Sequence, residues 1–188
     1  MSGKYRTIVA DPPWQITTKM GVGGHRARPT EVPYSMMSLD EIKALPVDSL
    51  AADEAHLYLW TTRRLFREGT AAAVARAWGF EPCGELIWGL RNPGIGGFNG
   101  NGHEPILIAA RGELPFPKNE LPAGVVFWRQ PYARGKLHGK LHSAKPEGFL
   151  DLVERVSPAP RVELFARRDR LGWDTWGNES LGTAELAS

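Results

Sequence analysis

Short apolar runs recur along the chain and predict the strands of a sheet. The first run, Thr7-Ile8-Val9-Ala10, is typical of a buried strand. Runs of similar length follow it at intervals along the chain. Together they predict strands over 5–10, 56–60, 86–90, 104–110, 125–128 and 161–166.

Helical patterns fall between the predicted strands. Ser38 followed by Glu41 forms a capping box, which predicts a short helix up to residue 45. An alanine-rich stretch predicts a helix over 63–78 that stops at a glycine. A third helix is predicted over 146–156, with a proline in its first turn. Strands that alternate with helices indicate an α/β fold.

No internal repeat and no clear linker divides the 188 residues. We therefore expect one domain over 1–188, with a core over about 5–179 and a mobile tail over 180–188. Long loops in a compact domain are usually functional or mobile. Three such loops are predicted, over 21–33, 94–102 and 129–143.

Composition narrows the class of protein. The formal net charge of +2 permits nucleic-acid binding without demanding it. The single cysteine, Cys83, excludes an internal disulfide framework and a cysteine-rich zinc site, and it is expected to be a small core residue. No run approaches the ~20 apolar residues of a membrane span, and the first residues lack the apolar region of a signal peptide. We therefore expect a cytoplasmic protein without a membrane partner.

The segment Asp11-Pro12-Pro13-Trp14 directly follows the first predicted strand. Two prolines continue neither a sheet nor a helix, so the chain must turn at the carboxyl end of the strand, where α/β sheets bind ligands. Asp11 and the Pro12 carbonyl can accept the hydrogens of an aromatic amine such as that of adenine. Pro13 fixes the carbonyl direction, and Trp14 offers a face for stacking. The alternative is a plain strand-ending turn, but four such residues in this order favour the functional interpretation.

Two familiar kinds of cofactor site are missing from the sequence. The stretch 94–99 lacks the last glycine of a dinucleotide-binding motif, and no Walker A motif is present, so any nucleotide-like cofactor must bind elsewhere than after the first strand. His103 and Glu104 are neighbours on a predicted strand and point to opposite faces. No other residues are spaced as zinc ligands, so we expect no metal.

The C-terminal third supplies a candidate cofactor site. Lys145 lies at a helix start, where backbone N–H groups and the helix dipole favour an anion such as an amino-acid carboxylate. Glu163 and Arg167 bracket the end of a strand, and Asn178 and Glu179 can bond the two hydroxyls of a ribose. Taken singly, Lys145 is as well explained as a solvated lysine, and Glu163 with Arg167 as a surface ion pair. The cluster as a whole favours a site.

Basic residues with interleaved aromatics are candidate nucleic-acid contacts. Such a loop suits phosphates and a stacked base, although charge runs are usually only solvated surface. The first set is Arg129, Arg134, Lys136 and Lys140, beside Trp128 and Tyr132, and the second is Arg26 and Arg28.

Several short motifs in one order resemble a known family, the N6-adenine methyltransferases of the permuted class. This class includes the catalytic subunit of the eukaryotic messenger-RNA adenosine methyltransferase and its bacterial and phage relatives. The resemblance covers about residues 5–179. It rests on Asp11-Pro12-Pro13-Trp14, Pro33-Tyr34-Ser35-Met36-Met37-Ser38, Asp40-Glu41-Ile42, Leu57-Tyr58-Leu59-Trp60, Glu85-Leu86-Ile87-Trp88, Gly102-His103-Glu104, Ser143-Ala144-Lys145-Pro146-Glu147, Glu163-Leu164-Phe165-Ala166-Arg167 and Trp176-Gly177-Asn178-Glu179.

The resemblance implies a fold and a cofactor. The fold is an α/β, Rossmann-like methyltransferase fold with a mostly parallel sheet and helices on both faces. The methyl donor is S-adenosylmethionine, and S-adenosylhomocysteine is the product. The catalytic motif precedes the cofactor motif in this class, which explains the missing glycine motif after the first strand.

The resemblance also implies roles for individual residues. Asp11 to Trp14 hold the target adenine, and Tyr34 lines the active site near the methyl group. Lys145 meets the methionine carboxylate. The other implied cofactor contacts are His142, Ser143, Glu163, Phe165, Arg167, Asn178 and Glu179.

This sequence differs from longer family members ahead of the first motif, where only ten residues precede Asp11. Segments that help to hold the cofactor's adenine in those relatives have no counterpart in it. Residues after Glu179 or within 129–143 are expected to substitute.

Two hypotheses of different classes remain. The first is an active methyltransferase on nucleic acid, with DNA favoured over RNA, and the second is a non-catalytic nucleic-acid-binding partner of the same fold. The complete first motif, together with Lys145, Arg167 and Asn178, favours the enzyme. No module for reading a base sequence is recognisable, so a homodimer or a partner subunit is a further expectation.

Overall fold

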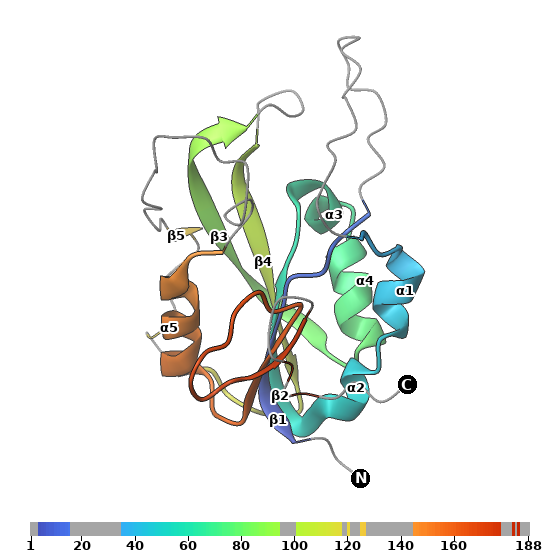
Figure 1. Cartoon of the computed structure of the whole chain (residues 1–188), viewed down its shortest axis with the longest axis vertical. Helices are drawn as coiled ribbons and strands as arrows, with labels where there is room; N and C mark the ends of the chain where they lie inside the picture. Colours follow the sequence, from blue (N-terminus) through green and yellow to red (C-terminus); the bar gives the residue numbers. More distant parts are fainter. Residues whose placement is uncertain are drawn as a thin grey trace.

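The chain folds around a twisted sheet whose first strand lies near its middle (Figure 1). The structure is a computed structural model, and it describes residues 4–15, 35–94, 101–117, 120, 125–126, 145–177, 182 and 184. In these residues the sheet has seven strands, in the order β5-β3-β4-β2-β1-β6-β7. Their bounds are β1 Tyr5–Ala10, β2 Ala51–Trp60, β3 Glu81–Gly94, β4 Asn101–Arg111, β5 Val125–Val126, β6 Arg161–Leu164 and β7 Asp174–Trp176.

Strand direction decides which ends of the strands meet. β1 runs parallel to its neighbours β2 and β6, and β7 runs parallel to β6. β4 is antiparallel to β2 and to β3, and β5 is parallel to β3. Only β4 is reversed among the described strands, so the predicted mostly parallel sheet is confirmed. The start of β4 therefore lies at the same edge as the carboxyl ends of β1, β2 and β6.

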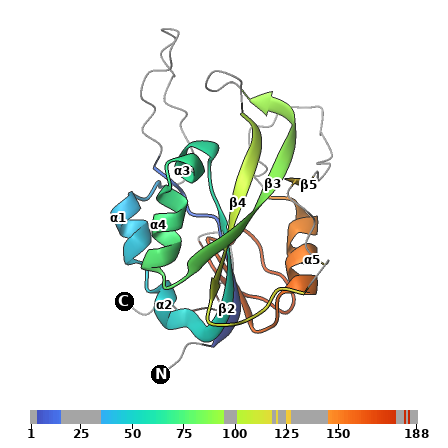
Figure 2. The ribbon, with the colours of Figure 1, turned by 180° about the vertical axis from the view of Figure 1, so that it is seen from behind.

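Helices cover both faces of the sheet, as expected (Figures 1 and 2). The core on one face takes side chains from four helices, and the core on the other face takes them from α5. β1 contributes Ile8 and Ala10 to the first core and Val9 to the second, which explains its continuous apolar run. The helix bounds are α1 Leu39–Ala44, α2 Val47–Leu50, α3 Arg63–Arg67, α4 Thr70–Ala77 and α5 Glu147–Val156.

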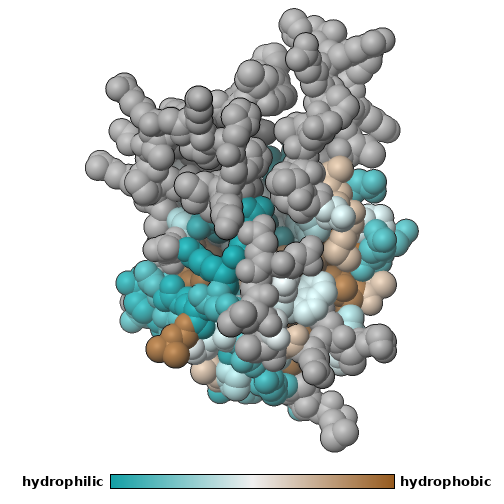
Figure 3. Space-filling model, viewed as in Figure 1, coloured by the Kyte–Doolittle hydropathy of each residue, from teal (hydrophilic) through white to brown (hydrophobic). Residues whose placement is uncertain are grey.

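The polarity of the surface can be followed on the face drawn in Figure 3. The part visible around α5 in Figure 3 is largely hydrophilic. The exposed large apolar side chains are Met36, Leu39 and Leu171. Among the helices of the described ranges, none combines the length and the hydropathy that a membrane crossing requires.

The predicted elements exist, but several ends differ. β2 and β3 begin five residues earlier than predicted, and β6 ends at Leu164, two residues sooner. The expected strand over 125–128 is described only for Val125–Val126. α2 and β7 were not predicted, because a single helical turn and a three-residue strand are too short to show a periodic pattern.

The helix predicted over 63–78 is wrong, because the structure has two helices there. α3 ends at Arg67 and α4 begins at Thr70. Gly69 between them has φ 76°, a left-handed backbone that glycine adopts without a steric penalty. The alanine-rich composition hid this break.

One further expectation, the burial of Cys83, requires correction, and one residue of the predicted tail is described. Cys83 is exposed rather than a core residue, because the pairing of β3 with β4 shifts register between Pro82 and Gly84 and leaves Cys83 outside the regular alternation. Ala184, in the tail that was expected to be mobile, is 6% exposed. Its N–H donates to the Thr175 carbonyl at 3.0 Å, so the tail packs on the sheet at this point.

A buried hydrogen-bond network joins β2 to the end of α5. His56 is fully buried, with Nε2 3.0 Å from the Leu114 carbonyl and Nδ1 2.7 Å from the Ser157 hydroxyl. A carbonyl only accepts, so Nε2 carries the ring proton and Nδ1 accepts from Ser157. Ser157 in turn accepts from the Tyr58 hydroxyl at 2.8 Å. Burial lowers the pKa of His56, which favours the neutral form that this network needs.

This network predicts that the free energy of unfolding decreases in mild acid and that His56 causes part of the decrease. The pKa of His56 is lower in the folded chain than the value of about 6.5 expected when it is unfolded. Its contribution is therefore complete above about pH 6.5 and declines as the pH falls, because the unfolded state takes up the proton first. We expect the stability advantage of the wild type over His56→Gln to shrink between pH 7.5 and 5, measured by urea unfolding.

The control is His103→Gln, which removes a partly exposed histidine outside the network; burial lowers its pKa too, so this variant also loses a share of the acid dependence. This variant should keep most of the acid-dependent loss seen in the wild type. An equal shrinkage for both variants, or none for His56→Gln, would contradict the role of the buried network.

Candidate active site

Residues distant in the sequence meet at the carboxyl edge of the sheet. Asp11 follows β1, and Glu104 lies near the start of the antiparallel β4 at the same edge. Lys145 comes just before Pro146, the N-cap of α5. The chain leaves β1 toward β2 on one side and returns to β6 on the other, which makes this edge a topological switch point. Ligands of α/β sheets bind at such points.

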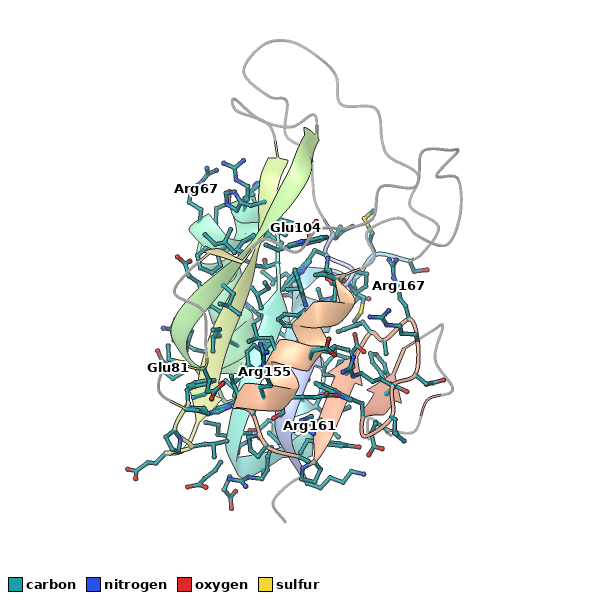
Figure 4. All side chains as sticks on the ribbon, turned by 90° about the vertical axis from the view of Figure 1, so that its left-hand side faces the viewer. Arg67, Glu81, Glu104, Arg155, Arg161 and Arg167 are labelled. Atoms are coloured by element: carbon teal, nitrogen blue, oxygen red, sulfur yellow. The ribbon has the colours of Figure 1, made fainter. Side chains whose placement is uncertain are left out.

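Lys145 bridges two carboxylates. Its Nζ lies 3.3 Å from Asp11 Oδ2 and 2.9 Å from Glu104 Oε2. It also lies 4.9 Å from the centre of the Trp60 ring, within the range of a cation–π contact. The Lys145 side chain is only 18% exposed, which excludes the alternative of a solvated surface lysine. Glu104 is labelled in Figure 4, at the end of the sheet where these groups meet.

The charges of this cluster are mutually dependent. Burial raises the pKa of Asp11; Lys145 acts against the rise, and Glu104 adds to it. Burial by itself would lower the pKa of Lys145, but the Asp11 and Glu104 carboxylates outweigh that effect and the pKa is raised. Lys145 therefore stays protonated. Two carboxylates share one ammonium, so the cluster has acceptor capacity left for a ligand that donates hydrogen bonds.

The turn formed by residues 11–14 is fixed by backbone hydrogen bonds. The Trp14 N–H donates to the Pro12 carbonyl at 2.8 Å, which closes a three-residue turn around Pro13. The Met37 N–H donates to the Pro13 carbonyl at 2.9 Å, so the segment before α1 lies beside the turn. The Pro12 carbonyl keeps one lone pair available, and its direction is fixed.

Trp14 points into the core, which corrects the expectation that its indole offers an open face to a base. It is 9% exposed, and its Nε1 donates to the Trp60 carbonyl at 3.0 Å. Trp14 thereby attaches the turn to the end of β2. Met36, beside the turn, is 48% exposed and is the large apolar side chain that faces solvent there.

Glu163 is a buried carboxyl on β6 beside β1. It pairs in register with Val9, two residues before Asp11. Burial raises the pKa of Glu163 to about 7; Arg168 opposes the rise and Asp11 adds to it. Its Oε2 is buried and has no hydrogen-bond partner in the structure. A buried acceptor without a partner at a ligand-binding edge suits a ligand that supplies a donor.

The backbone after β6 is strained and closely packed. Phe165 has φ 63°, which is rare for a residue other than glycine. The Trp176 carbonyl accepts from the Ala166 N–H at 3.0 Å. A Cβ on Gly177 would collide with the backbone of Ala166 and Phe165, so only glycine fits this approach. The predicted cofactor motifs around 163–167 and 176–177 therefore meet in space.

The structure places only part of the predicted site. It brings Asp11, Pro12, Pro13, Lys145 and Glu163 to one edge, with Phe165 at the end of β6 and Arg167 shortly beyond it. Arg167 lies in the same half of the molecule as Glu104 in Figure 4. The other predicted site residues lie outside the described residues: Tyr34, His142, Ser143, Asn178, Glu179, Arg26, Arg28, Arg129, Arg134, Lys136 and Lys140.

Sequence reasoning missed the role of Glu104. It treated His103 and Glu104 as a possible metal or acid–base pair, yet Glu104 is one of the two carboxylates that hold Lys145. The motif Gly102-His103-Glu104 was the available indication. Over the described ranges, no three His, Cys, Asp or Glu side chains are grouped so that they could hold a metal ion.

Comparison with known proteins gives one family and several relatives. The sequence model of the MT-A70 family matches residues 5–179. The Type II methyltransferase M.MunI of Mycoplasma sp is 28% identical, over 94% of this chain and 78% of its own length. The Drosophila melanogaster N(6)-adenosine-methyltransferase MT-A70-like protein is 30% identical over 96% of this chain and 28% of its own. The human N(6)-adenosine-methyltransferase catalytic subunit METTL3 is 28% identical, over 96% of this chain and 29% of its own length. The chain thus spans less than a third of these two animal relatives.

The raised pKa of Glu163 predicts that replacing its carboxyl with an amide stabilises the fold, and that this gain grows as the pH rises. Its pKa in the folded chain, about 7, lies above the value of about 4.3 expected when unfolded. Its favourable contribution is therefore complete below about pH 4.3 and is lost as the pH rises to about 7. Glu163→Gln should match the wild type near pH 4 and be more stable by roughly 1–3 kcal/mol at pH 8, measured by urea unfolding.

The matched control is Glu85→Gln, which removes an exposed carboxylate from β3. No gain that grows with pH is expected for it. A Glu163→Gln variant that is less stable than the wild type at pH 8 would show that the carboxylate is satisfied when ionised.

Proposed function

We propose that this chain, which belongs to the MT-A70 family, is an S-adenosylmethionine-dependent N6-adenine methyltransferase that acts on nucleic acid. The observation that carries the proposal is the position of Asp11. It stands at the switch-point edge, beside a fixed carbonyl, and contacts an ammonium that is itself held by Glu104. This arrangement suits the binding of an amine that must present its lone pair in one direction.

The residues at the edge fit S-adenosylmethionine. Lys145 is a protonated, mostly buried ammonium that can take an amino-acid carboxylate in place of one of its present partners. Glu163 Oε2 is a buried acceptor that lacks a partner in the structure, and the close approach at Gly177 shapes the backbone beside it. Arg167, Asn178 and Glu179 remain the predicted ribose contacts, with His142, Ser143 and Phe165 as further contacts. The bound cofactor would supply an electrophilic methyl group.

Asp11 and Pro12 would activate the target amine by accepting its hydrogens. The exocyclic nitrogen of adenine is a weak nucleophile, because its lone pair is delocalised into the ring. The Asp11 carboxylate accepts one hydrogen, and the free lone pair of the Pro12 carbonyl accepts the other. Both acceptors are fixed before the base arrives, so little reorganisation is needed to draw the nitrogen toward a tetrahedral shape.

Proton release requires no strong base. A methylated exocyclic amine is acidic once it carries the additional positive charge, and water can remove its proton. Asp11 is suited to receive that proton first, because burial raises its pKa.

The target base would have to leave its stack to reach Asp11. The turn is anchored on both sides, to the Trp60 carbonyl through Trp14 and to Met37 through Pro13, so it cannot extend into a duplex. Enzymes that modify bases meet this constraint by extruding the nucleotide, at a cost of a few kcal/mol. Because Trp14 is covered, stacking of the extruded base would depend on another residue near the turn, such as Met36.

We favour DNA over RNA as the substrate. The relatives named for adenosine, which is a ribonucleoside, are matched over less than a third of their length, whereas the Type II methyltransferase M.MunI is matched over 78% of its length. RNA is the alternative, since the relatives named N(6)-adenosine-methyltransferases match over 96% of this chain. A third hypothesis is that the chain is a non-catalytic nucleic-acid-binding partner of the same fold. The intact Asp11–Lys145–Glu104 cluster argues against it.

The proposal predicts methyl transfer that depends on Asp11. Purified protein would be incubated with methyl-labelled S-adenosylmethionine and either adenine-containing DNA or RNA of the same base sequence, followed by digestion to nucleosides. We expect label in N6-methyl-2′-deoxyadenosine. Asp11→Asn should lower the rate at least ~10–100-fold, because a hydrogen bond to a charged group contributes about 1.5–3 kcal/mol, while cofactor affinity stays within a few-fold.

The control is Asp48→Asn, which removes an exposed carboxylate paired with Arg111 and should leave the rate unchanged. Label in RNA alone would favour the RNA alternative. No label in either polymer, from protein that binds both cofactor and nucleic acid, would favour the non-catalytic partner.

A second prediction concerns Lys145. If it holds the amino-acid carboxylate of the cofactor, Lys145→Met should weaken S-adenosylmethionine and S-adenosylhomocysteine equally, by ~10–100-fold in calorimetric titration. Adenosine lacks that carboxylate and should bind as it does to the wild type. Lys4→Met, which breaks an exposed pair with Asp174, is the control and should change neither affinity. Equal weakening of adenosine would instead show that Lys145 affects cofactor binding only by holding Asp11 and Glu104 in place.

A further inference from the structure

A short arginine-rich helix stands at the rim of the candidate active site. α3 (Arg63–Arg67) begins three residues after Trp60, whose carbonyl holds Trp14 and whose ring lies beneath Lys145. Arg63 also lies close enough to His103 to lower its pKa, an effect second to that of burial. His103 directly precedes Glu104 on β4. α3 is therefore next to the edge at which Asp11, Glu104 and Lys145 meet.

The side chains of α3 divide into two groups. Leu65 and Phe66 pack against the core, and the Nε of Arg64 donates to Glu68 Oε1 at 2.8 Å. Arg63 and Arg67 are four residues apart and so lie on the same side of the helix, away from the core. Arg67 is exposed and Arg63 partly so.

The centre of the site is acidic while this rim is basic. Asp11 and Glu104 share the one ammonium of Lys145, Arg167 has a smaller effect on Asp11 than Lys145 does, and Glu163, with a pKa of about 7, is only partly ionised at neutral pH. The carboxylates around Lys145 therefore offer a phosphate no favourable contact. A nucleic-acid strand that delivers one base to Asp11 must keep its phosphates outside that centre. Arginine suits this task, because its planar guanidinium binds phosphate oxygens in pairs.

We propose that the outer side of α3, formed by Arg63 and Arg67, binds phosphates of the nucleic-acid strand that flank the target adenine. This inference rests on the proposed function and adds a contact surface that the basic segments 26–28 and 129–140 did not include. Figure 4 shows Arg67 at the same end of the molecule as Glu104, with Glu81 and Arg155 toward the other end. Such contacts position the strand without reading its bases.

The test is the salt dependence of nucleic-acid binding by a double variant. Arg63→Gln with Arg67→Gln removes two phosphate contacts, so the slope of log affinity against log salt should fall by roughly 1.4–1.8, the lower value applying to a single strand. The KM for nucleic acid should rise, with kcat and the affinity for S-adenosylhomocysteine unchanged. Binding would be measured by fluorescence anisotropy of a labelled adenine-containing oligonucleotide in the presence of S-adenosylhomocysteine.

Two control variants make the result specific. Arg76→Gln with Arg155→Gln removes the same charge from exposed arginines, one of them paired with Glu81 away from this edge, and should leave the slope unchanged. Arg63→Lys with Arg67→Lys keeps the charge, and it should retain most of the slope if the glutamine effect is lost phosphate contact rather than damage to α3.

The outcomes separate this inference from the proposed function. The α3 inference would be wrong if the salt slope of the α3 glutamine variant equalled that of the wild type, or if the slope of the distant control fell by the same amount. Methyl transfer by the wild type would still support the proposed enzyme in either case. If the wild type neither bound nor methylated DNA or RNA, both the α3 inference and the proposed function would be wrong. A reduced slope confined to the glutamine variant of α3, together with a raised KM, is the result that supports the inference.

Discussion

The functional edge depends on one buried ammonium. Lys145 precedes α5, Asp11 follows β1, and Glu104 lies near the start of β4, so a single cation joins three segments that are distant in the sequence. The cluster is also electrostatically incomplete, since two carboxylates share that charge. Removing the ammonium would leave two partly buried carboxylates facing each other, which is strongly unfavourable. A site built in this way is held in place by the same charges that it presents to a ligand.

Strand direction makes this cluster possible. A parallel strand would present its carboxyl end to this edge, but β4 is reversed and presents its first residues instead. Glu104 can therefore face Asp11 across β2 although it lies at the opposite end of its own strand. β1 has a strand neighbour on each edge and a helix-covered core on each face, and this burial in turn desolvates Asp11 where the strand ends. The raised pKa of Asp11 is thus a consequence of topology as much as of local contacts.

Features that depend on neighbouring residues, such as strands and turns, were predictable from the sequence. Contacts between residues distant in the sequence were not. The apolar runs located six of the strands, and the proline pair located the turn after β1. Glu104 could not be recognised as a partner of Lys145, because nothing local reveals which strand is reversed. Trp14 was assigned to stacking from its residue type alone. Its burial is decided by the Trp60 carbonyl, 46 residues further along the chain.

Within the segment 11–14, Asp11 and Trp14 have different positions and therefore different roles. The indole and the Pro13 carbonyl face the protein and fix the turn to β2 and to the segment before α1. The proposed function assigns the carboxylate and the remaining Pro12 lone pair to the target amine. A conservative change at Trp14 would therefore alter the direction of Asp11 rather than remove a contact with the base. An acceptor that is misdirected by even a fraction of an ångström loses much of its effect on a transition state, so the anchoring residues matter to the chemistry as much as the acceptor itself.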